Sequence, residues 1–223
     1  LKDLEKEYSG HEQSYKFLKQ YLTLHRSELF FADKAIFIEG DTERVLLPAI
    51  MKKIDQEDFS SEFTGGNPHA LPLLSQNISI IEVGAYSQIF EKFIDFIGTK
   101  SLVITDIDST GMIPEKDKNG TIKKNPDGTD KLKRGACPVT SGDHTSNSSL
   151  QFFYGKEKTL ADFIALNQEH RFLKKDPASK DWIPDAGGNL LCVYQTRETA
   201  DGVEYHARSF EDAFFHINKP FIA

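Results

Sequence analysis

Short apolar runs that alternate with segments of helical spacing constrain the fold of this chain more than any other feature. Residues 34–38, 78–83 and 101–105 are mostly apolar runs that end at a glycine or an acid, which predicts buried strands. The segments between them, 43–53 and 86–97, carry apolar side chains at the spacing of one helix face. This order is typical of an α/β fold whose parallel strands are joined by right-handed crossovers.

Three further segments extend this pattern towards both ends of the chain. Residues 2–24 predict an amphipathic helix, residues 190–194 a fourth strand and residues 209–217 a closing helix. Pro48 has no backbone N–H, so we expect the helix over 43–53 to kink there or to begin late.

Two segments interrupt the alternation. Residues 110–135 contain Asn-Gly and Pro-Asp-Gly turns and predict a turn-rich loop or hairpin that is locally basic. Residues 140–188 combine a Ser/Thr/Asn run, a helix near 157–168 and a Pro/Gly-rich connector. We therefore expect an inserted helical segment between the third and fourth strands.

Composition excludes several classes of protein. The 223 residues include 34 acids and 27 bases, and the net charge of −7 argues against a basic, histone-like nucleic-acid binder. An enzyme that acts on nucleic acid is not excluded, because carboxylates that hold metals are themselves negative. No apolar run approaches the roughly 18–20 residues of a membrane span. Two cysteines are too few for a disulfide framework or a cysteine zinc site, so we expect a cytoplasmic protein without membrane contact.

Acidic residues follow two of the predicted strands directly. Glu39 lies at the carboxyl end of the first strand, and Asp106 and Asp108 at that of the third. Such strand ends line one crevice in an open α/β sheet, and Glu43, four residues after Glu39, could face it too. Carboxylates that converge repel one another unless hard cations neutralise them, and oxygen ligands favour Mg²⁺ or Mn²⁺ over zinc. The alternative is that these acids are solvated loop residues or helix caps.

These acids belong to motifs that resemble a known family. The turn at 38–40 (Ile-Glu-Gly), together with the Asp-x-Asp at 106–108, resembles the Toprim domain. Residues 38–48 (Ile-Glu-Gly-Asp-Thr-Glu-Arg-Val-Leu-Leu-Pro) resemble the OLD-family nucleases (overcoming lysogenisation defect) in particular. Residues 145–147 (Thr-Ser-Asn) and 208–214 (Arg-Ser-Phe-Glu-Asp-Ala-Phe) support that branch. The resemblance implies a Toprim-like Rossmannoid parallel sheet flanked by helices, with an inserted helical segment.

The resemblance also implies a DNA endonuclease that hydrolyses phosphodiester bonds with two Mg²⁺ or Mn²⁺ ions. Two divalent ions roughly 4 Å apart can clamp a phosphodiester, one activating water and the other stabilising the leaving oxygen. The implied ligands of the two ions, or of the waters they carry, are Glu39, Glu43, Asp106, Asp108 and Glu211.

Other polar residues near these motifs have two interpretations each. Lys219 matches the position near which OLD nucleases carry a lysine that stabilises the developing charge, but it is equally interpreted as a surface lysine. Ser109 follows the Asp pair and either bonds a metal-bound water or phosphate, or caps the next turn. The basic residues of the loop could track a DNA backbone or simply be solvated: Lys116, Lys118, Lys123, Lys124, Lys131, Lys133 and Arg134.

The alternatives within and outside the Toprim group differ in chemistry. A topoisomerase-like module needs an attacking tyrosine, a primase-like one needs template and nucleotide sites, and a catalytically silent one serves DNA binding or assembly. A receiver-like domain would hold one Mg²⁺ and accept a phosphate, but its acids follow another pattern than Glu39 and Glu43. The presence of all the motif acids argues against a silent module, and the Thr42-Glu43 step with the Arg-Ser-Phe-Glu block at 208–211 favours the nuclease.

OLD proteins join an ATPase domain to the Toprim domain, and this chain has no Gly-x-x-x-x-Gly-Lys-Ser/Thr loop. We therefore expect a C-terminal nuclease portion whose partners are DNA and an N-terminal ATPase domain, with a helicase-type partner left open. The expected parts are an N-terminal helix that ends a linker or arm (1–30), the first part of the Toprim core (31–139), the inserted segment and connector (140–188), and the last strand and closing helix (189–223).

Overall fold

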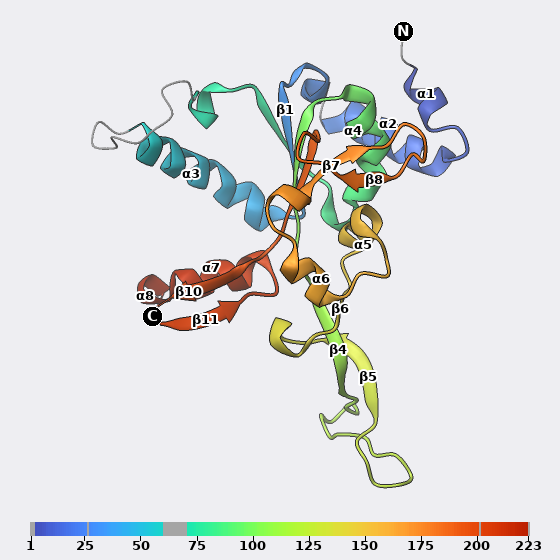
Figure 1. Ribbon diagram of the computed structural model, residues 1–223, viewed down its shortest axis with the longest axis vertical. Coiled ribbons are helices and arrows are strands. Elements are labelled where there is room, and N and C mark those ends of the chain that lie inside the picture. The colour runs from blue at the N-terminus through green and yellow to red at the C-terminus, as the bar shows by residue number, and fades with distance from the viewer. Residues whose placement is uncertain (1–2, 26, 60–70, 201, 223) are drawn as a thin grey trace. The chain divides into compact units, whose positions relative to one another are not determined.

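The computed structural model describes residues 3–25, 27–59, 71–200 and 202–222 (Figure 1). The chain forms two compact units. The first unit comprises residues 1–105 and 168–193, and the second comprises residues 106–167 and 194–223. Within the described ranges, no helix combines the length and the apolar character needed to cross a membrane.

The first unit is built on a mixed sheet in which most strands are parallel. β1 lies between β2 and β3, β9 continues the parallel order beyond β3, and β7 and β8 add an antiparallel edge. In sheet order the strands are β2 (Ile78–Glu82), β1 (Lys34–Ile38), β3 (Lys100–Ile104), β9 (Leu190–Val193), β7 (Phe172–Lys175) and β8 (Trp182–Pro184). The α/β prediction with a parallel sheet is confirmed.

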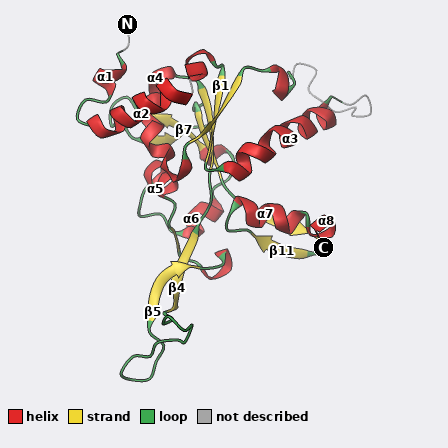
Figure 2. Cartoon of the chain, turned by 180° about the vertical axis from the view of Figure 1, so that it is seen from behind, coloured by secondary structure: helices red, strands yellow, loops and turns green. Residues whose placement is uncertain are grey.

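Helices cover both faces of this sheet, as Figures 1 and 2 show for α3 (Asp41–Asp58) on one side and α2 (Glu12–His25) and α4 (Glu91–Ile97) on the other. Ile36 and Ile38 of β1 share a buried apolar cluster with Leu47 and Met51 of α3. On the opposite face, Phe37 packs against Phe90, which also contacts Tyr21 of α2. Strands covered on both faces are expected to be apolar throughout, which is the pattern of β1.

The helices differ in detail from the sequence-based expectation. The segment expected to be one N-terminal helix is divided into α1 (Leu4–Glu7) and α2, with Gly10 between them at φ 79°. Glycine adopts such positive φ values without the steric cost that a Cβ imposes. α3 begins at Asp41 and contains Pro48 in its interior, so of the two alternatives expected for Pro48 the late start is wrong, and the kink stays a prediction. A 3₁₀ helix at Gly84–Phe90 precedes α4.

The second unit contains two small antiparallel sheets. β4 (Ser109–Pro114) pairs with β5 (Leu132–Ala136) and β6 (His144–Thr145), so the hairpin predicted over 110–135 is confirmed. β10 (Arg197–Ala200) and β11 (Val203–His206) form a second hairpin that the sequence did not indicate. The helices of this unit are α5 (Ser148–Tyr154), α6 (Leu160–Ala165), α7 (Phe210–Ile217) and α8 (Lys219–Ile222).

The segment over 140–188 contains α6, which lies within the helix expected near 157–168, and also α5 and the strands β7 and β8, which the sequence did not indicate. Leu173 of β7 is fully buried, whereas its neighbour Lys174 is exposed. This alternation is typical of a strand with one buried and one solvent-facing side, but the strand is only four residues long in β7. The Pro/Gly-rich residues around β7 indicated a connector, so the short alternation of buried and exposed residues did not lead to a strand prediction.

Candidate functional site

The turn between β1 and α3 holds the two glutamates of the first motif, both in the first unit. The backbone N–H of Gly40 donates a hydrogen bond to Glu43 Oε2 at 3.0 Å. Glu43 is 4% exposed, and its carboxylate lies at the N-terminus of α3, where the helix dipole favours a negative charge. One of the four strand-end acids thus acts as a helix cap, as the alternative interpretation of these acids proposed.

Glu39 is half-buried and is held by a residue at the end of another strand. The buried hydroxyl of Thr105 donates a hydrogen bond to Glu39 Oε1. Thr105 follows β3 directly, and the next residue in the chain is Asp106. The carboxyl ends of β1 and β3 are therefore connected by a side-chain contact within the first unit.

Asp106 begins the second unit, and two donors that are distant in sequence hold its carboxylate. Asp106 Oδ1 accepts from the side-chain amide of Gln195 and from the backbone N–H of Phe210, both at 2.8 Å. The other end of the Gln195 amide accepts from the backbone N–H of Ile107, also at 2.8 Å. Gln195 therefore fixes both the side chain of Asp106 and the backbone that follows it.

Asp108 has a left-handed backbone conformation and an ion pair. Its φ is 45°, a region that aspartate tolerates better than most residues with a Cβ. Asp108 Oδ1 lies 2.9 Å from Arg208 Nη2, and Arg208 Nε donates to the carbonyl of Ser109 at 3.1 Å. The carbonyl of Asp108 accepts from both the N–H and the hydroxyl of Ser146, at 3.0 and 3.2 Å.

The remaining predicted site residues occupy different environments in the second unit. Ser109 is fully buried, and its hydroxyl donates to the carbonyl of Cys137, so a direct contact with metal or phosphate stays a prediction. Glu211 is exposed in the first turn of α7, directly after Phe210, which contacts Asp106. Lys219 is exposed at the start of α8 and forms no ion pair with any acid that the structure describes.

The predicted acidic ligands carry carboxylate oxygens, which suit hard cations, but several of these carboxylates already contact other groups of the protein. Every predicted ligand apart from Ser109 supplies carboxylate oxygens, the donors that Mg²⁺ and Mn²⁺ prefer. Over residues 3–25, 27–59, 71–200 and 202–222, no three His, Cys, Asp or Glu side chains are grouped closely enough to hold a metal ion. The fit of this chain to divalent ions therefore rests on donor chemistry.

Sequence analysis missed two residues that hold the acids. Gln195 lies two residues beyond the carboxyl end of β9. Ligand-binding residues gather at the carboxyl ends of such strands, and this position was the signal by which Gln195 could have been found. Arg208 opens the motif at 208–214, but nothing in the motif indicates that its guanidinium pairs with Asp108.

Three of the six lysines of the β4–β5 hairpin pair with acids of the same hairpin. Lys123 and Lys131 contact Glu115 at 2.5 and 3.0 Å, and Lys124 contacts Asp130. Hydrogen bonds from Lys123 and then Lys131 lower the pKa of Glu115 to about 2. These ion pairs account for part of the basic character that the sequence analysis considered for DNA.

Comparisons with known proteins agree with the motifs. The family described as "Overcoming lysogenization defect protein-like, TOPRIM domain" matches residues 30–108, which contain Glu39, Glu43, Asp106 and Asp108. The chain is 26% identical over 215 residues to Endonuclease GajA of Bacillus cereus (strain HuB5-5), an alignment that covers 96% of this chain. The chain spans about a quarter of the length of that relative, 24%. No solved structure matches the chain.

Proposed function

We propose that this chain, a Toprim domain of an OLD-family protein, hydrolyses phosphodiester bonds of DNA with the help of bound divalent cations. The observation that carries the proposal is the alignment of 96% of the chain with an endonuclease, in a protein whose strand-end acids match the family motifs. A nuclease-type role follows from this similarity. The use of two metals and the identity of the ligands are the finer parts of the proposal.

The proposed ligands of two Mg²⁺ or Mn²⁺ ions are Glu39, Glu43, Asp106, Asp108 and Glu211, with Ser109 as a further oxygen donor. Two bound divalent ions would supply an activated water and would stabilise charge on the leaving oxygen. Support for the set comes from its oxygen-only chemistry and from the contacts that orient its members. Carboxylates that bind metals are commonly held in place by further hydrogen bonds, as Asp106 is by Gln195.

The chain offers two cations for the proposed chemistry. Lys219 is our candidate for stabilising charge that develops on the scissile phosphate. Arg208 has a different role, because its guanidinium contacts Asp108 and the carbonyl of Ser109. Arg208 keeps the carboxylate of Asp108 in one orientation and offsets part of its charge.

The test is cleavage of supercoiled plasmid in the presence of EDTA, Mg²⁺, Mn²⁺ or Ca²⁺, beside an Asp106→Ala variant. We expect nicked or linear plasmid with Mg²⁺ or Mn²⁺, and intact plasmid with EDTA or with the variant. Cleavage that survives in the variant would place the activity elsewhere or in a contaminant. Intact plasmid under all conditions would contradict the proposal.

One observation favours a second candidate, a catalytically silent Toprim module for DNA binding or assembly. Among the described residues the acids are engaged with protein donors, and no group of three is gathered for a metal. A silent module would bind DNA and leave the plasmid intact with every metal. Topoisomerase-like or primase-like strand chemistry would instead yield relaxed plasmid or new primers.

The partners of the chain also remain proposals. The resemblance to OLD proteins implies DNA as substrate and an ATPase domain as partner, and the 24% coverage of the relative leaves length for further domains. A helicase-type partner and a cytoplasmic location belong to the same proposal.

A further inference from the structure

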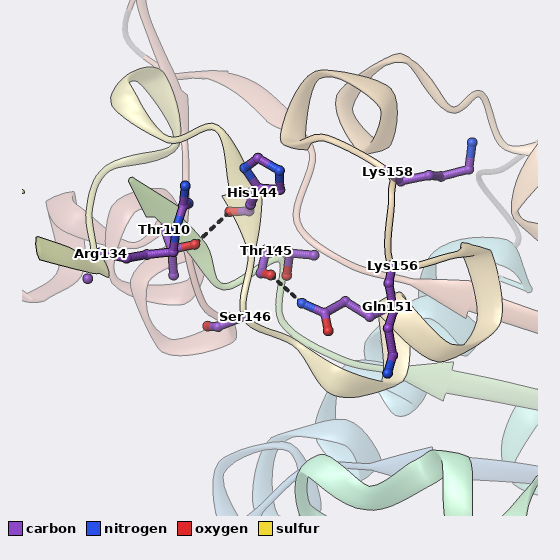
Figure 3. A pocket seen from close by; sticks show the side chains of 9 residues that line it. Thr110, Arg134, His144, Thr145, Ser146, Gln151, Lys156 and Lys158 are labelled. Carbon is purple, nitrogen blue, oxygen red and sulfur yellow. Dashed lines mark hydrogen bonds between the residues drawn. The ribbon is translucent and has the colours of Figure 1, made fainter. Parts of the chain in front are cut away.

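A pocket of about 560 Å³ lies within the second unit, and none of the proposed metal ligands is among the residues that line it (Figure 3). None of the residues that line it is acidic, although the whole chain has a net charge of −7. The lining combines cations, hydroxyls and amides, from Thr110, Arg134, Gly135, His144, Thr145, Ser146, Gln151, Lys156 and Lys158.

The cations of the pocket come from two sides, as Figure 3 shows. Arg134 extends from β5, and its guanidinium pairs with both carboxylate oxygens of Asp143. Hydrogen bonds from Arg134, and to a lesser degree from His144, lower the pKa of Asp143. The pair with Asp143 also holds the guanidinium of Arg134 at the pocket wall. Arg has five N–H donors, so two bonds to Asp143 leave capacity for an anion.

Lys156 and Lys158 lie on the segment between α5 and α6, and their side chains extend in different directions in Figure 3. Among the residues that the structure describes, neither lysine has an ion-pair partner. Hydrogen bonds from Thr159, and to a lesser degree the charge of Lys158, lower the pKa of Asp162, but Lys158 and Asp162 form no ion pair. Two unpaired ammonium groups with different directions suit successive charges of a polyanion better than one small anion.

The wall of the pocket is braced by hydrogen bonds. Thr110 Oγ1 donates to the carbonyl of His144 at 3.2 Å, and Gln151 Nε2 donates to the carbonyl of Thr145 at 2.7 Å (Figure 3). Ser146 connects this wall to the carbonyl of Asp108 through its N–H and hydroxyl. The basic pocket is thus joined by direct hydrogen bonds to the backbone of a proposed metal ligand.

We propose that this pocket binds the phosphodiester backbone of the DNA beside the position of cleavage. The inference rests on the proposed function for the class of its ligand. Arginine, lysine and hydroxyl side chains are the groups that contact DNA phosphates, and such contacts position the duplex without reading its sequence. Arg134, Lys156 and Lys158 neutralise phosphates. The hydrogen bonds of Ser146 hold the pocket wall at a fixed position relative to the backbone of Asp108.

The test measures binding of a fluorescently labelled duplex oligonucleotide by anisotropy, in EDTA, over a series of salt concentrations. For a Lys156→Ala/Lys158→Ala double variant we expect weaker binding of two unrelated sequences to the same degree. We also expect the slope of log K against log salt to fall by about 0.9 for each phosphate contact that is lost. A double variant whose affinity and salt slope equal those of the unchanged chain would overturn the proposal.

Lys16→Ala/Lys19→Ala is the matched control, because it removes the same number of charges from exposed positions of α2 that do not line the pocket. We expect this variant to bind as the unchanged chain does. An equal loss for Lys16→Ala/Lys19→Ala would mean that positive charge in general, and not the pocket, binds the DNA. If the double variant unfolds, the single variants Lys156→Gln and Lys158→Gln at these surface positions carry the test.

Two further arms separate the possible outcomes. Inorganic pyrophosphate at constant ionic strength tests for a small-anion site: pyrophosphate binding that the double variant loses while it keeps its affinity for DNA would contradict a backbone site. The binding assay contains no divalent metal, so it measures DNA binding independently of cleavage. DNA binding that depends on the pocket, together with intact plasmid in the cleavage assay, would contradict the proposed function but not this inference. Absence of DNA binding by the unchanged chain would overturn the inference.

Discussion

The two units of the molecule place different buried side chains beside their acidic residues, although hydrogen bonds hold acids in both. In the first unit, the strand that leads to Glu39 is apolar, and Phe37 and Ile38 are fully buried. In the second unit, the elements that follow Asp106 also bury hydroxyls and an amide, from Ser109, Thr110, Thr145, Asn147 and Ser149. Apolar packing therefore positions the strand before Glu39, whereas buried polar groups accompany the chain after Asp106.

The contacts of the acids also differ in their separation along the chain. Glu43 is fixed by the backbone of Gly40, three residues away, through the local geometry of a strand–helix turn. Asp106 is fixed by Gln195 and Phe210, which are 89 and 104 residues away in the chain, and Glu39 is held by Thr105, 66 residues away. Local patterns can therefore predict the contact of Glu43, whereas the contacts of Glu39 and Asp106 depend on the folded chain.

The largest expected effect concerns the apolar core of the first unit. Phe37→Ala removes a ring that is 0% exposed, and we expect a loss of about 3–5 kcal/mol in the free energy of unfolding. Met112→Ala in the second unit, where the side chain is 54% exposed, is the control and should change stability by less than about 0.5 kcal/mol. Urea denaturation measures both. Equal losses would break the comparison between the units.

The next effect concerns the long-range contact that orients Asp106. Gln195→Ala removes the amide that bonds both Asp106 and the backbone of Ile107. Loss of a residue that orients a metal ligand costs about 10–100-fold in activity or metal affinity, and we expect a loss in this range for plasmid cleavage. Thermal unfolding should show that the variant is folded. A folded Gln195→Ala variant with full cleavage would show that Asp106 needs no such support.

A smaller effect is expected for a buried polar residue of the second unit. Asn147 is 2% exposed and caps α5, with Oδ1 accepting from the N–H groups of Ser149 and Leu150 at 3.0 Å each. Asn147→Ala should destabilise the protein by about 0.5–2 kcal/mol in urea denaturation. Asn147→Ser keeps an oxygen acceptor and should recover part of this loss. A cost for Asn147→Ala that matches Phe37→Ala would remove the distinction between the buried polar and the buried apolar residue.

The smallest effect is expected in the β4–β5 hairpin, where Glu115 has a pKa of about 2 because Lys123 and Lys131 donate to it. The unfolded value is about 4.3, so the ion pairs stabilise the folded hairpin fully above that pH. Their contribution is lost as the pH falls from about 4.3 towards the folded value of about 2. An NMR titration of the Glu115 carboxyl measures this pKa, and Lys123→Ala should raise it. A value near 4.3 in the unchanged chain would contradict the ion pairs.

The sequence predicted the helices and strands whose apolar residues recur regularly because they face the same buried side. β1 to β3, β9 and α7 were found because their apolar residues follow one simple period. The hairpin of β10 and β11 was not found, since its strands mix charged, polar and apolar residues and are largely exposed. β7 and β8 were missed because a strand of four or three residues gives too short a pattern.

The candidate site was predictable only in part for a related reason. The acids stand in local motifs, so Glu39 and Asp106 could be named from the sequence. Gln195 and Arg208 act through contacts that exist only after the chain has folded, and the sequence marks neither contact beyond the place of Gln195 after a predicted strand. The hydrogen-bond donors of each carboxylate can therefore be identified only in the folded structure.

The measurement that tests the central claim most directly is a titration with Mn²⁺, followed by electron paramagnetic resonance, of the unchanged chain and of Asp106→Asn. The substitution removes the charge of Asp106 and keeps an oxygen that can accept from Gln195 and Phe210, so the fold should be retained. We predict that the unchanged chain binds two Mn²⁺ ions, and that the folded variant binds fewer ions or binds them at least about tenfold more weakly. Identical titrations of the two proteins would show that Asp106 does not bind the metal and would contradict the account.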